Sequence, residues 1–170
     1  MGTQPLLPEP HMSVEEYLHT SFDGADREYL DGEVVERNMG NKSHGKVQAE
    51  LIFFFKKLEK QTGLFVIPEL RHRVTRTRYR IPDVAVFEGE PPEQVPADPP
   101  LVAIEILSPD DRIGYIVPKL EEYRRWGVNY IWVIDPEDRK LLTYGAEGLH
   151  EVAALALAKY EITLTTADLF

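Results

Sequence analysis

Cysteine is absent from this chain of 170 residues. Its absence excludes a disulfide scaffold, a zinc site built from thiolates and a cysteine nucleophile. Long apolar runs are absent too, because stretches such as 51–55 and 152–158 fall far short of the roughly 20 residues that cross a bilayer. The chain also does not open with the basic and then apolar segments of a signal peptide. We therefore expect a cytoplasmic protein without a membrane segment.

Basic charge is scarce. Lys and Arg number 19 against 29 Asp and Glu, and this net charge of -10 argues against coating nucleic acid through bulk positive charge. The exception is the segment 71–80, which is rich in arginine and contains no acid. In a regular strand Arg76, Arg78 and Arg80 share one face, which suits contact with nucleic-acid phosphates. The alternative is an exposed edge strand whose charges keep it from pairing with another chain.

Length and composition are those of one globular domain. Hydrophobic residues at 43% and charged residues at 28% lie near the globular average. A domain of this size buries roughly 70% of its unfolded surface, so it folds without a metal or disulfide. The start of the chain is rich in proline and has no periodicity. We interpret 1–11 as a flexible leader and 12–170 as a single domain.

The first half of the domain shows a hairpin and a helix. Asp31-Gly32 separates two strand-like runs, and this pair is a strong hairpin signal because a type I′ turn needs positive φ at both positions. An apolar stripe predicts a helix over 43–62. Gly63 follows at the position where a left-handed residue often ends a helix.

The second half alternates strands with one further helix. Leu120, Tyr123 and Trp126 mark that helix, and Pro118 suits its first turn, where a missing N–H does no harm. A short hairpin and a final helical turn are expected near the C-terminus. The fold class is therefore α/β (α+β), a mixed β-sheet flanked by helices. After the helix over 43–62, the expected strands are 64–67, 71–79, 83–87, 101–107, 130–134 and 140–144.

Glu105 is the most informative residue, because it lies inside the apolar run 101–107. An isolated carboxylate buried among such neighbours costs several kcal/mol unless it is protonated, paired or bound to a cation. The alternative is a glutamate at a strand end that reaches solvent or binds an arginine.

Asp83 opens the preceding strand, and the loop 88–100 can return the chain so that the two strands lie side by side. Asp83 and Glu105 are then expected close enough to share one divalent ion in a cleft. Two such carboxylates repel each other unless positive charge lies between them. Mg²⁺ held by two carboxylates and waters is the usual arrangement. The alternative for Asp83 is a turn residue that bonds its own backbone.

The same residues carry a resemblance to a known family. The chain resembles the PD-(D/E)XK nuclease superfamily, and within it the Uma-two-like restriction endonucleases, from Met12 almost to the C-terminus. The order and spacing of the matching segments make this resemblance specific. These segments are Ser13–Leu18, Tyr29–Glu33, Ser43-His44, Pro82-Asp83, Glu105–Pro109, Lys119 with Tyr123, Gly127-Val128 and Trp132–Pro136.

The resemblance implies a restriction-endonuclease-like core and a metal site. Asp83 and Glu105 would hold Mg²⁺ or Mn²⁺, with the backbone carbonyl of Ile106 as a third ligand. The superfamily pattern places a lysine two residues after the glutamate, where this chain has Leu107. Lys119 on the following helix is the basic residue that would compensate, and the alternative for it is a solvated surface lysine.

Four further residues match positions that line the pocket of the family: Glu28, Glu33, His44 and Ser108. Each has an ordinary alternative. A histidine at a helix start is most often a surface residue, and Glu33 alternates with an apolar neighbour and could face water. Ser108 is also a common turn former.

The leading hypothesis is a metal-dependent endonuclease that hydrolyses phosphodiester bonds of DNA. Two alternatives stay open. One is a catalytically degenerate nucleic-acid-binding module, which Leu107 and the acidic net charge favour. The other is a homodimeric interaction protein in which the buried carboxylates serve structure.

Overall fold

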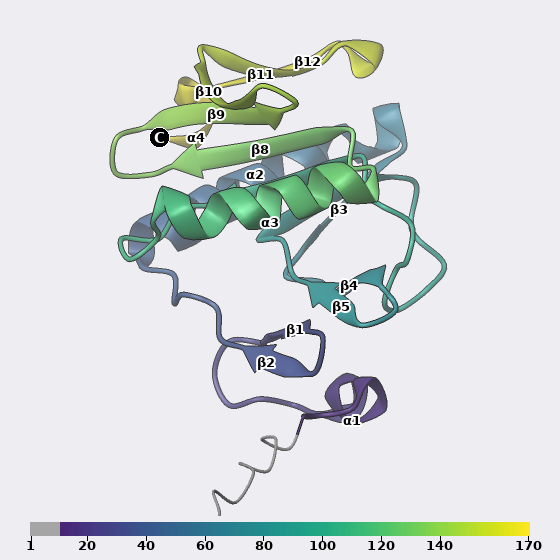
Figure 1. Ribbon diagram of the computed structural model, residues 1–170. Helices are drawn as coiled ribbons and strands as arrows, with labels where there is room; N and C mark the ends of the chain where they lie inside the picture. Colours follow the sequence, from purple (N-terminus) through teal and green to yellow (C-terminus); the bar gives the residue numbers. More distant parts are fainter. Residues whose placement is uncertain (1–10) are drawn as a thin grey trace, which may run out of the picture.

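The centre of the protein is a sheet of six strands with a helix on each face (Figure 1). The structure is a computed structural model that describes residues 11–170, so the predicted leader lies almost entirely outside the described residues. The strands follow the order β10-β9-β8-β7-β6-β3. Their bounds are Leu64–Pro68 for β3, Val84–Glu88 for β6, Val102–Ile106 for β7, Tyr130–Asp135 for β8, Lys140–Gly145 for β9 and Gly148–Val152 for β10.

The pair β7 and β8 is parallel, whereas the other neighbours in this sheet are antiparallel. A parallel pair needs a crossover connection, which α3 (Ile113–Trp126) supplies across one face. The other face is covered by α2 (Lys42–Thr62). Ile104 on β7 packs with Leu51 and Phe55 of α2. Its neighbour Ala103 packs with α3 instead, as the alternation of side chains along a strand requires.

A smaller sheet lies beside this body and has the order β2-β1-β5-β4. Its elements, with the helix packed on them, are α1 (Val14–His19), β1 (Glu28–Leu30), β2 (Glu33–Val35), β4 (His72–Thr75) and β5 (Arg78–Arg80). Tyr17, Tyr29 and Tyr79 form the buried aromatic cluster of this part. The hydroxyl of Tyr29 donates to the carbonyl of Met12 at 2.7 Å, which ties the start of the described chain to β1.

The C-terminal segment forms the hairpin of β11 (Ala154–Leu157) and β12 (Ile162–Thr165), joined by the 3-10 turn Ala158–Tyr160. The helical turn α4 (Thr166–Leu169) follows and contacts α2. The expected hairpin and final helical turn are both present. None of the helices in residues 11–170 is long and apolar enough to span a membrane.

The predicted fold class is confirmed, since a mixed sheet lies between helices. The predicted turn at Asp31-Gly32 and the predicted helix end at Gly63 are also confirmed, since both adopt positive φ angles. Asp31 and Gly32 have φ of 53° and 105° in the β1–β2 turn. Gly63 ends α2 with φ of 74°, and the expected side-by-side placement of β6 and β7 is present.

Two expectations were wrong. The arginine-rich segment is a hairpin rather than one strand, because the chain turns at Arg76-Thr77 and β5 pairs back on β4. Pro118 is inside α3 rather than in its first turn, because the helix already begins at Ile113. The N–H that Pro118 lacks would have bonded the carbonyl of Gly114 in the first turn of α3, so the loss is confined to the start of this helix.

His72 gives the fold a testable acid sensitivity. It is fully buried, stacks on Phe87 and bonds the carbonyl of Leu70 through Nδ1 at 2.7 Å, while its Nε2 has no partner among the described residues. Burial lowers the pKa of His72 to about 4, although the Leu70 carbonyl opposes the shift. The unfolded chain therefore takes up this proton near pH 6.5, well before the folded protein does.

We expect stability to fall as the pH drops from 6.5 towards 4, with His72 contributing about 2 kcal/mol of the loss by pH 5. Urea unfolding at pH 7.5 and pH 5 measures this loss of stability. The H72F variant should lose about 2 kcal/mol less than the parent between these pH values, whereas H150Q, at an exposed histidine, should follow the parent. Equal losses for the parent and H72F would contradict the assignment.

Candidate active site

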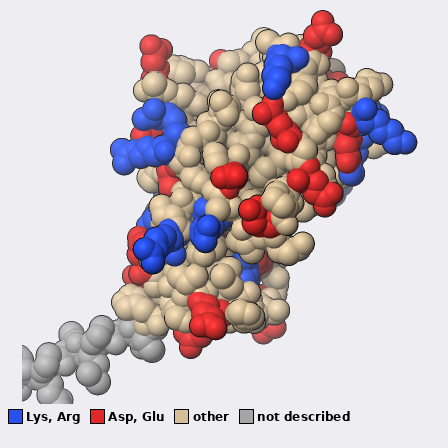
Figure 2. All heavy atoms as spheres, turned by 90° about the vertical axis from the view of Figure 1, so that its right-hand side faces the viewer, with Lys and Arg blue, Asp and Glu red and all other residues tan. Residues whose placement is uncertain are grey.

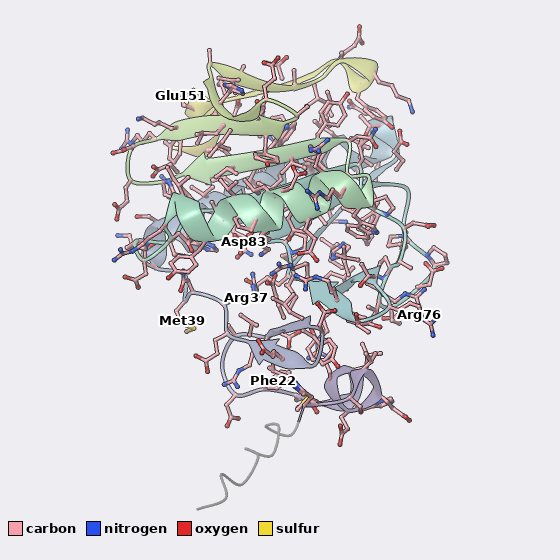
Figure 3. All side chains as sticks on the ribbon, in the orientation of Figure 1. Phe22, Arg37, Met39, Arg76, Asp83 and Glu151 are labelled. Atoms are coloured by element: carbon pink, nitrogen blue, oxygen red, sulfur yellow. The ribbon has the colours of Figure 1, made fainter. Side chains whose placement is uncertain are left out.

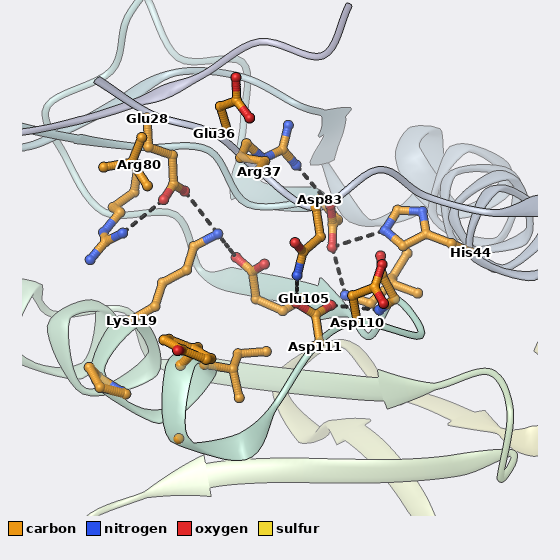
Figure 4. Close-up of a pocket in the computed structure, with 18 of the residues that line it drawn as sticks. Glu28, Glu36, Arg37, His44, Arg80, Asp83, Glu105, Asp110, Asp111 and Lys119 are labelled. Carbon is orange, nitrogen blue, oxygen red and sulfur yellow. Dashed lines mark hydrogen bonds and ion pairs between the residues drawn. The ribbon is translucent and has the colours of Figure 1, made fainter. Parts of the chain in front are cut away.

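A cleft of about 540 Å³ is lined by residues of the small sheet, such as Glu28 and Arg80, and by residues of β7 and α3, such as Glu105 and Lys119. Its size is that of small-molecule and cofactor sites, roughly 300–1,000 Å³. Charged side chains of both signs line it, as the close-up in Figure 4 shows. They include Glu28, Arg37, His44, Arg80, Asp83, Glu105, Asp111 and Lys119.

Strand register brings Asp83 and Glu105 to the same place. Val84 pairs with Ile104 in the antiparallel ladder of β6 and β7, so Asp83 and Glu105 are neighbours on the opposite, α3-facing side of the sheet. The N–H of Ile106 donates to Oδ2 of Asp83 at 2.7 Å, which fixes the aspartate against the end of β7. Both carboxylates are 6% exposed and line the cleft.

Lys119 and Tyr123 of α3 meet Glu105 from one helix face. The Lys119 ammonium lies 2.9 Å from Oε1 of Glu105, and the Tyr123 hydroxyl donates to the same oxygen at 2.7 Å. Lys119 also lies 2.8 Å from Oε1 of Glu28 and 3.4 Å from the carbonyl of Ile81. The ammonium therefore bridges two buried carboxylates that come from different sheets.

Glu28 is itself held by three donors. Arg80 donates to its Oε2 at 2.8 Å, and the Ile81 N–H donates to Oε1 at 2.9 Å. Burial alone would raise the pKa of Glu28, but the charges of Lys119 and Arg80 outweigh burial and lower it to about 2. Glu28 is thus a fixed anion that positions Lys119.

Asp83 has its own partners on the opposite side. Arg37 donates to Oδ1 at 2.8 Å, and Nε2 of His44 lies 3.3 Å from Oδ2 (Figure 4). Burial opposes ionisation of Asp83, yet the bond from His44 and the charges of Lys119 and Arg37 keep its pKa below the ordinary value. The same bond raises the pKa of His44. Asp83 is therefore held as a carboxylate.

Glu105 differs from its neighbours. Burial raises its pKa to about 7, Lys119 opposes this shift, and the negative charges of Asp83 and Glu28 add to it. Among the described residues, no side chain donates to Oε2 of Glu105, which leaves that oxygen available to a ligand. An additional cation beside Glu105 would therefore favour its charged form.

A divalent ion such as Mg²⁺ needs oxygen donors that converge on one point. The described residues contain no group of three or more histidine and carboxylate side chains placed to hold a metal. Two carboxylates do line the cleft with the Ile106 peptide, and Mg²⁺ commonly takes one or two carboxylates and keeps several waters. Asp83, Glu105 and Ile106 fit such an ion.

Comparison with known proteins identifies the family. The family model Uma2, described as "Putative restriction endonuclease", matches residues 14–164. The chain belongs to the Uma2 family. A search of curated proteins found no match to the chain.

Among solved structures, this Uma2 chain is similar to one described as a "putative nuclease belonging to DUF820" from Anabaena variabilis. The TM-score is 0.79 at 22% sequence identity, and the match covers 94% of this chain and 97% of the other. At this identity the likeness shows a shared fold. The shared fold agrees with the mixed sheet between helices that was expected from the sequence.

The structure brings most of the predicted site residues of this Uma2 protein together. Asp83, Glu105, Ile106 and Lys119 line the cleft, and so do His44 and Ser108. Glu33 does not. It shares a face of β2 with the lining residue Val35, but it lies at the start of the strand beside the Asp31-Gly32 turn and is exposed.

Of the three predicted arginines, Arg78 and Arg80 stay together on β5 and share Glu122, whereas Arg76 is separated from them. Arg80 is buried in the cleft wall and pairs with Glu28 and Glu122. Arg78 pairs with Asp31 and Glu122. Figure 3 shows Arg76 at the outer end of the β4–β5 hairpin, away from Asp83, because the turn breaks the parity that one strand would have kept.

Sequence reasoning missed Arg37, Asn38 and Asp111 as cleft residues. Nothing local to Arg37 signals its partner, which lies 46 positions away in the chain. Lys119 and Tyr123 are one turn apart in the sequence and can share a helix face, and the structure adds that the Tyr123 hydroxyl donates to Glu105. Two polar groups on the sheet-facing side of a helix indicate a buried polar partner.

Proposed function

We propose that this Uma2 protein is a Mg²⁺- or Mn²⁺-dependent nuclease that hydrolyses phosphodiester bonds of DNA. One observation carries the proposal: Asp83, directly before β6, and Glu105, on the adjacent β7, are buried in the wall of one cleft, with Lys119 bound to Glu105. Family membership and the nuclease-like fold support the same reaction class.

Asp83 and Glu105, with the Ile106 carbonyl, would hold the ion. When bound, a divalent ion would polarise the phosphate and lower the pKa of the attacking water. In the net reaction a phosphorus–oxygen bond to the water oxygen forms, the bond to the leaving oxygen breaks, and that leaving oxygen receives the proton that the water gives up.

Lys119 serves this reaction as a positive charge. An ammonium has three donors, and the Lys119 group faces three acceptors in Glu28, Glu105 and the Ile81 carbonyl. It is therefore held protonated and stabilises negative charge as it develops on the phosphate. This position on α3 replaces the lysine that the superfamily places where the chain has Leu107.

The proposal predicts a strict metal requirement. The protein, stripped with EDTA, should cut supercoiled plasmid or single-stranded circular DNA only after Mg²⁺ or Mn²⁺ is restored. The same ions should raise its melting temperature, since a ligand that binds only the folded state stabilises it. Gel analysis of nicked and linear products and a thermal-shift assay measure the two effects.

The E151Q variant is the matched control, because Glu151 is exposed on the β10 side of the large sheet, away from Asp83 (Figure 3). It should cut like the parent. Equal cleavage in EDTA, or no cleavage with either ion, would overturn the proposed function. A degenerate binding module would then be the better description.

A further inference from the structure

Several arginines near the cleft are paired with carboxylates and are not free to bind the phosphates of a DNA duplex. A protein that binds double-stranded DNA through its backbone neutralises several phosphates with free Lys and Arg. Here Arg78 and Arg80 are bound to carboxylates, and so is Arg71, which pairs with Asp26 at 2.6 Å. Figure 2 shows the side of the molecule away from Met39, and there too basic and acidic side chains are interspersed without a continuous basic stripe.

The reactive groups also lie deep. Asp83 and Glu105 are each only 6% exposed at the wall of a cleft of about 540 Å³. The two rims of its entrance are linked, because the Asn38 amide donates to Oδ1 of Asp111, whose Oδ2 accepts from the Ser108 N–H at 2.6 Å. A phosphate must leave the surface of a stacked duplex to reach these groups, whereas a flexible single strand can enter.

An exposed aromatic side chain lines the cleft, because Tyr115 is 81% exposed. Two more exposed apolar side chains are next to lining residues in the chain, Met39 at 71% and Ile113 at 67% exposure. Met39 follows the lining residue Asn38, and Ile113 precedes the lining residue Gly114. Exposed apolar groups that cluster at one place mark an interaction site.

These observations fit an unpaired strand. Bases of single-stranded nucleic acid stack on exposed aromatic rings, and this stacking tolerates any sequence because every base has a π-face. The acidic groups that would hold a metal line the same cleft as Tyr115. A strand whose base stacks on Tyr115 would place its backbone towards Asp83 and Glu105.

We propose that the cleft accepts a single-stranded nucleic acid, with a base stacked on Tyr115, in preference to an intact duplex. The inference rests on the proposed nuclease function and names the substrate class for it. DNA and RNA strands share the chemistry of a stacked base on a charged backbone, so both are included in the test.

The test is equilibrium binding by fluorescence anisotropy in Ca²⁺, with three fluorescein-labelled probes of one sequence: a DNA strand, its duplex and the RNA strand. The parent should bind at least one single strand about 10-fold more tightly than the duplex. The Y115A variant should lose about 5- to 150-fold in affinity for that strand, the range for one stacked base. Y115F keeps the ring and should bind like the parent.

The F53A variant is the matched control. Phe53 is 59% exposed on α2 and is not among the residues that line the cleft. It should bind like the parent. Duplex binding as tight as strand binding, no binding to either strand, or unchanged affinity in Y115A would each overturn the inference.

The experiments distinguish a failure of the proposed substrate class from a failure of the proposed nuclease function. Cleavage of a duplex in Mg²⁺ without preference for a single strand would overturn the substrate class and leave the nuclease standing. Strand binding that depends on Tyr115, without cleavage in any metal, would support the strand-binding cleft and overturn the nuclease.

Discussion

Replacing Lys119 with Met is expected to abolish DNA cleavage and to destabilise the fold by about 3–5 kcal/mol. The ammonium lies 2.8 Å from Glu28 and 2.9 Å from Glu105, both of which are buried. Methionine fills a similar volume but leaves those carboxylates without their shared cation. Removing one partner of a buried ion pair costs more than the pair itself contributes, because the remaining charge stays desolvated.

Urea unfolding of K119M against the parent measures the loss of stability, and plasmid nicking measures the loss of activity. K60M is the matched control, because Lys60 is exposed in the last turn of α2 and its removal should cost about 0.5 kcal/mol. The double variant K119M/E105Q should regain part of the lost stability but no activity. A K119M protein as stable as the parent would show that Lys119 does not bridge the carboxylates in solution.

Replacing Glu105 with Gln is expected to lower the rate of cleavage by about 100-fold or more while the fold survives. The glutamine of E105Q keeps the shape of the side chain and a hydrogen bond from Tyr123, but it lacks the charge that would hold the metal. Stabilisation of charge by a bound metal is worth several kcal/mol in the transition state, which corresponds to at least 100-fold in rate. Lys119 keeps the Glu28 carboxylate as its partner and the Glu105 carboxylate is costly to bury, so the neutral replacement should change stability by no more than about 1 kcal/mol.

Initial rates at saturating Mn²⁺, together with the shift in melting temperature that Mn²⁺ produces, measure the two effects. The shift should shrink in E105Q and stay unchanged in the E151Q control. Cleavage by E105Q at the parental rate would contradict the role of Glu105. A cleavage defect with an unchanged Mn²⁺ shift would place Glu105 in the reaction but not at the metal.

Much of the local structure followed from the sequence. Asp31-Gly32 predicts a turn with positive φ, and Gly63 predicts the end of α2, because few other residues adopt those backbone angles. The helix over 42–62 followed from one apolar stripe. The burial of Glu105 followed from its apolar neighbours. These features depend on residues close together in the chain.

The sequence was misleading where two structures satisfy one local pattern. Alternating residues from 71 to 80 fit one strand as well as a hairpin, and only pairing with β1 and β4 decides for the hairpin. Pro118 fits a first helical turn, but packing of Ile116 and Leu120 against the sheet extends α3 back to Ile113. Tertiary contacts outweigh the small free-energy differences of local propensity.

For this protein, the sequence by itself determined the resemblance to the Uma2 family, the mixed sheet between helices and the two carboxylates at its centre. Only the tertiary structure decided which charges meet them. Arg37 reaches Asp83 across 46 positions, and Lys119 joins Glu28 to Glu105 across two sheets. The physical reason is that a buried charge is stable only with a partner at hydrogen-bond distance, and that partner is supplied by the register and packing of strands distant in the chain.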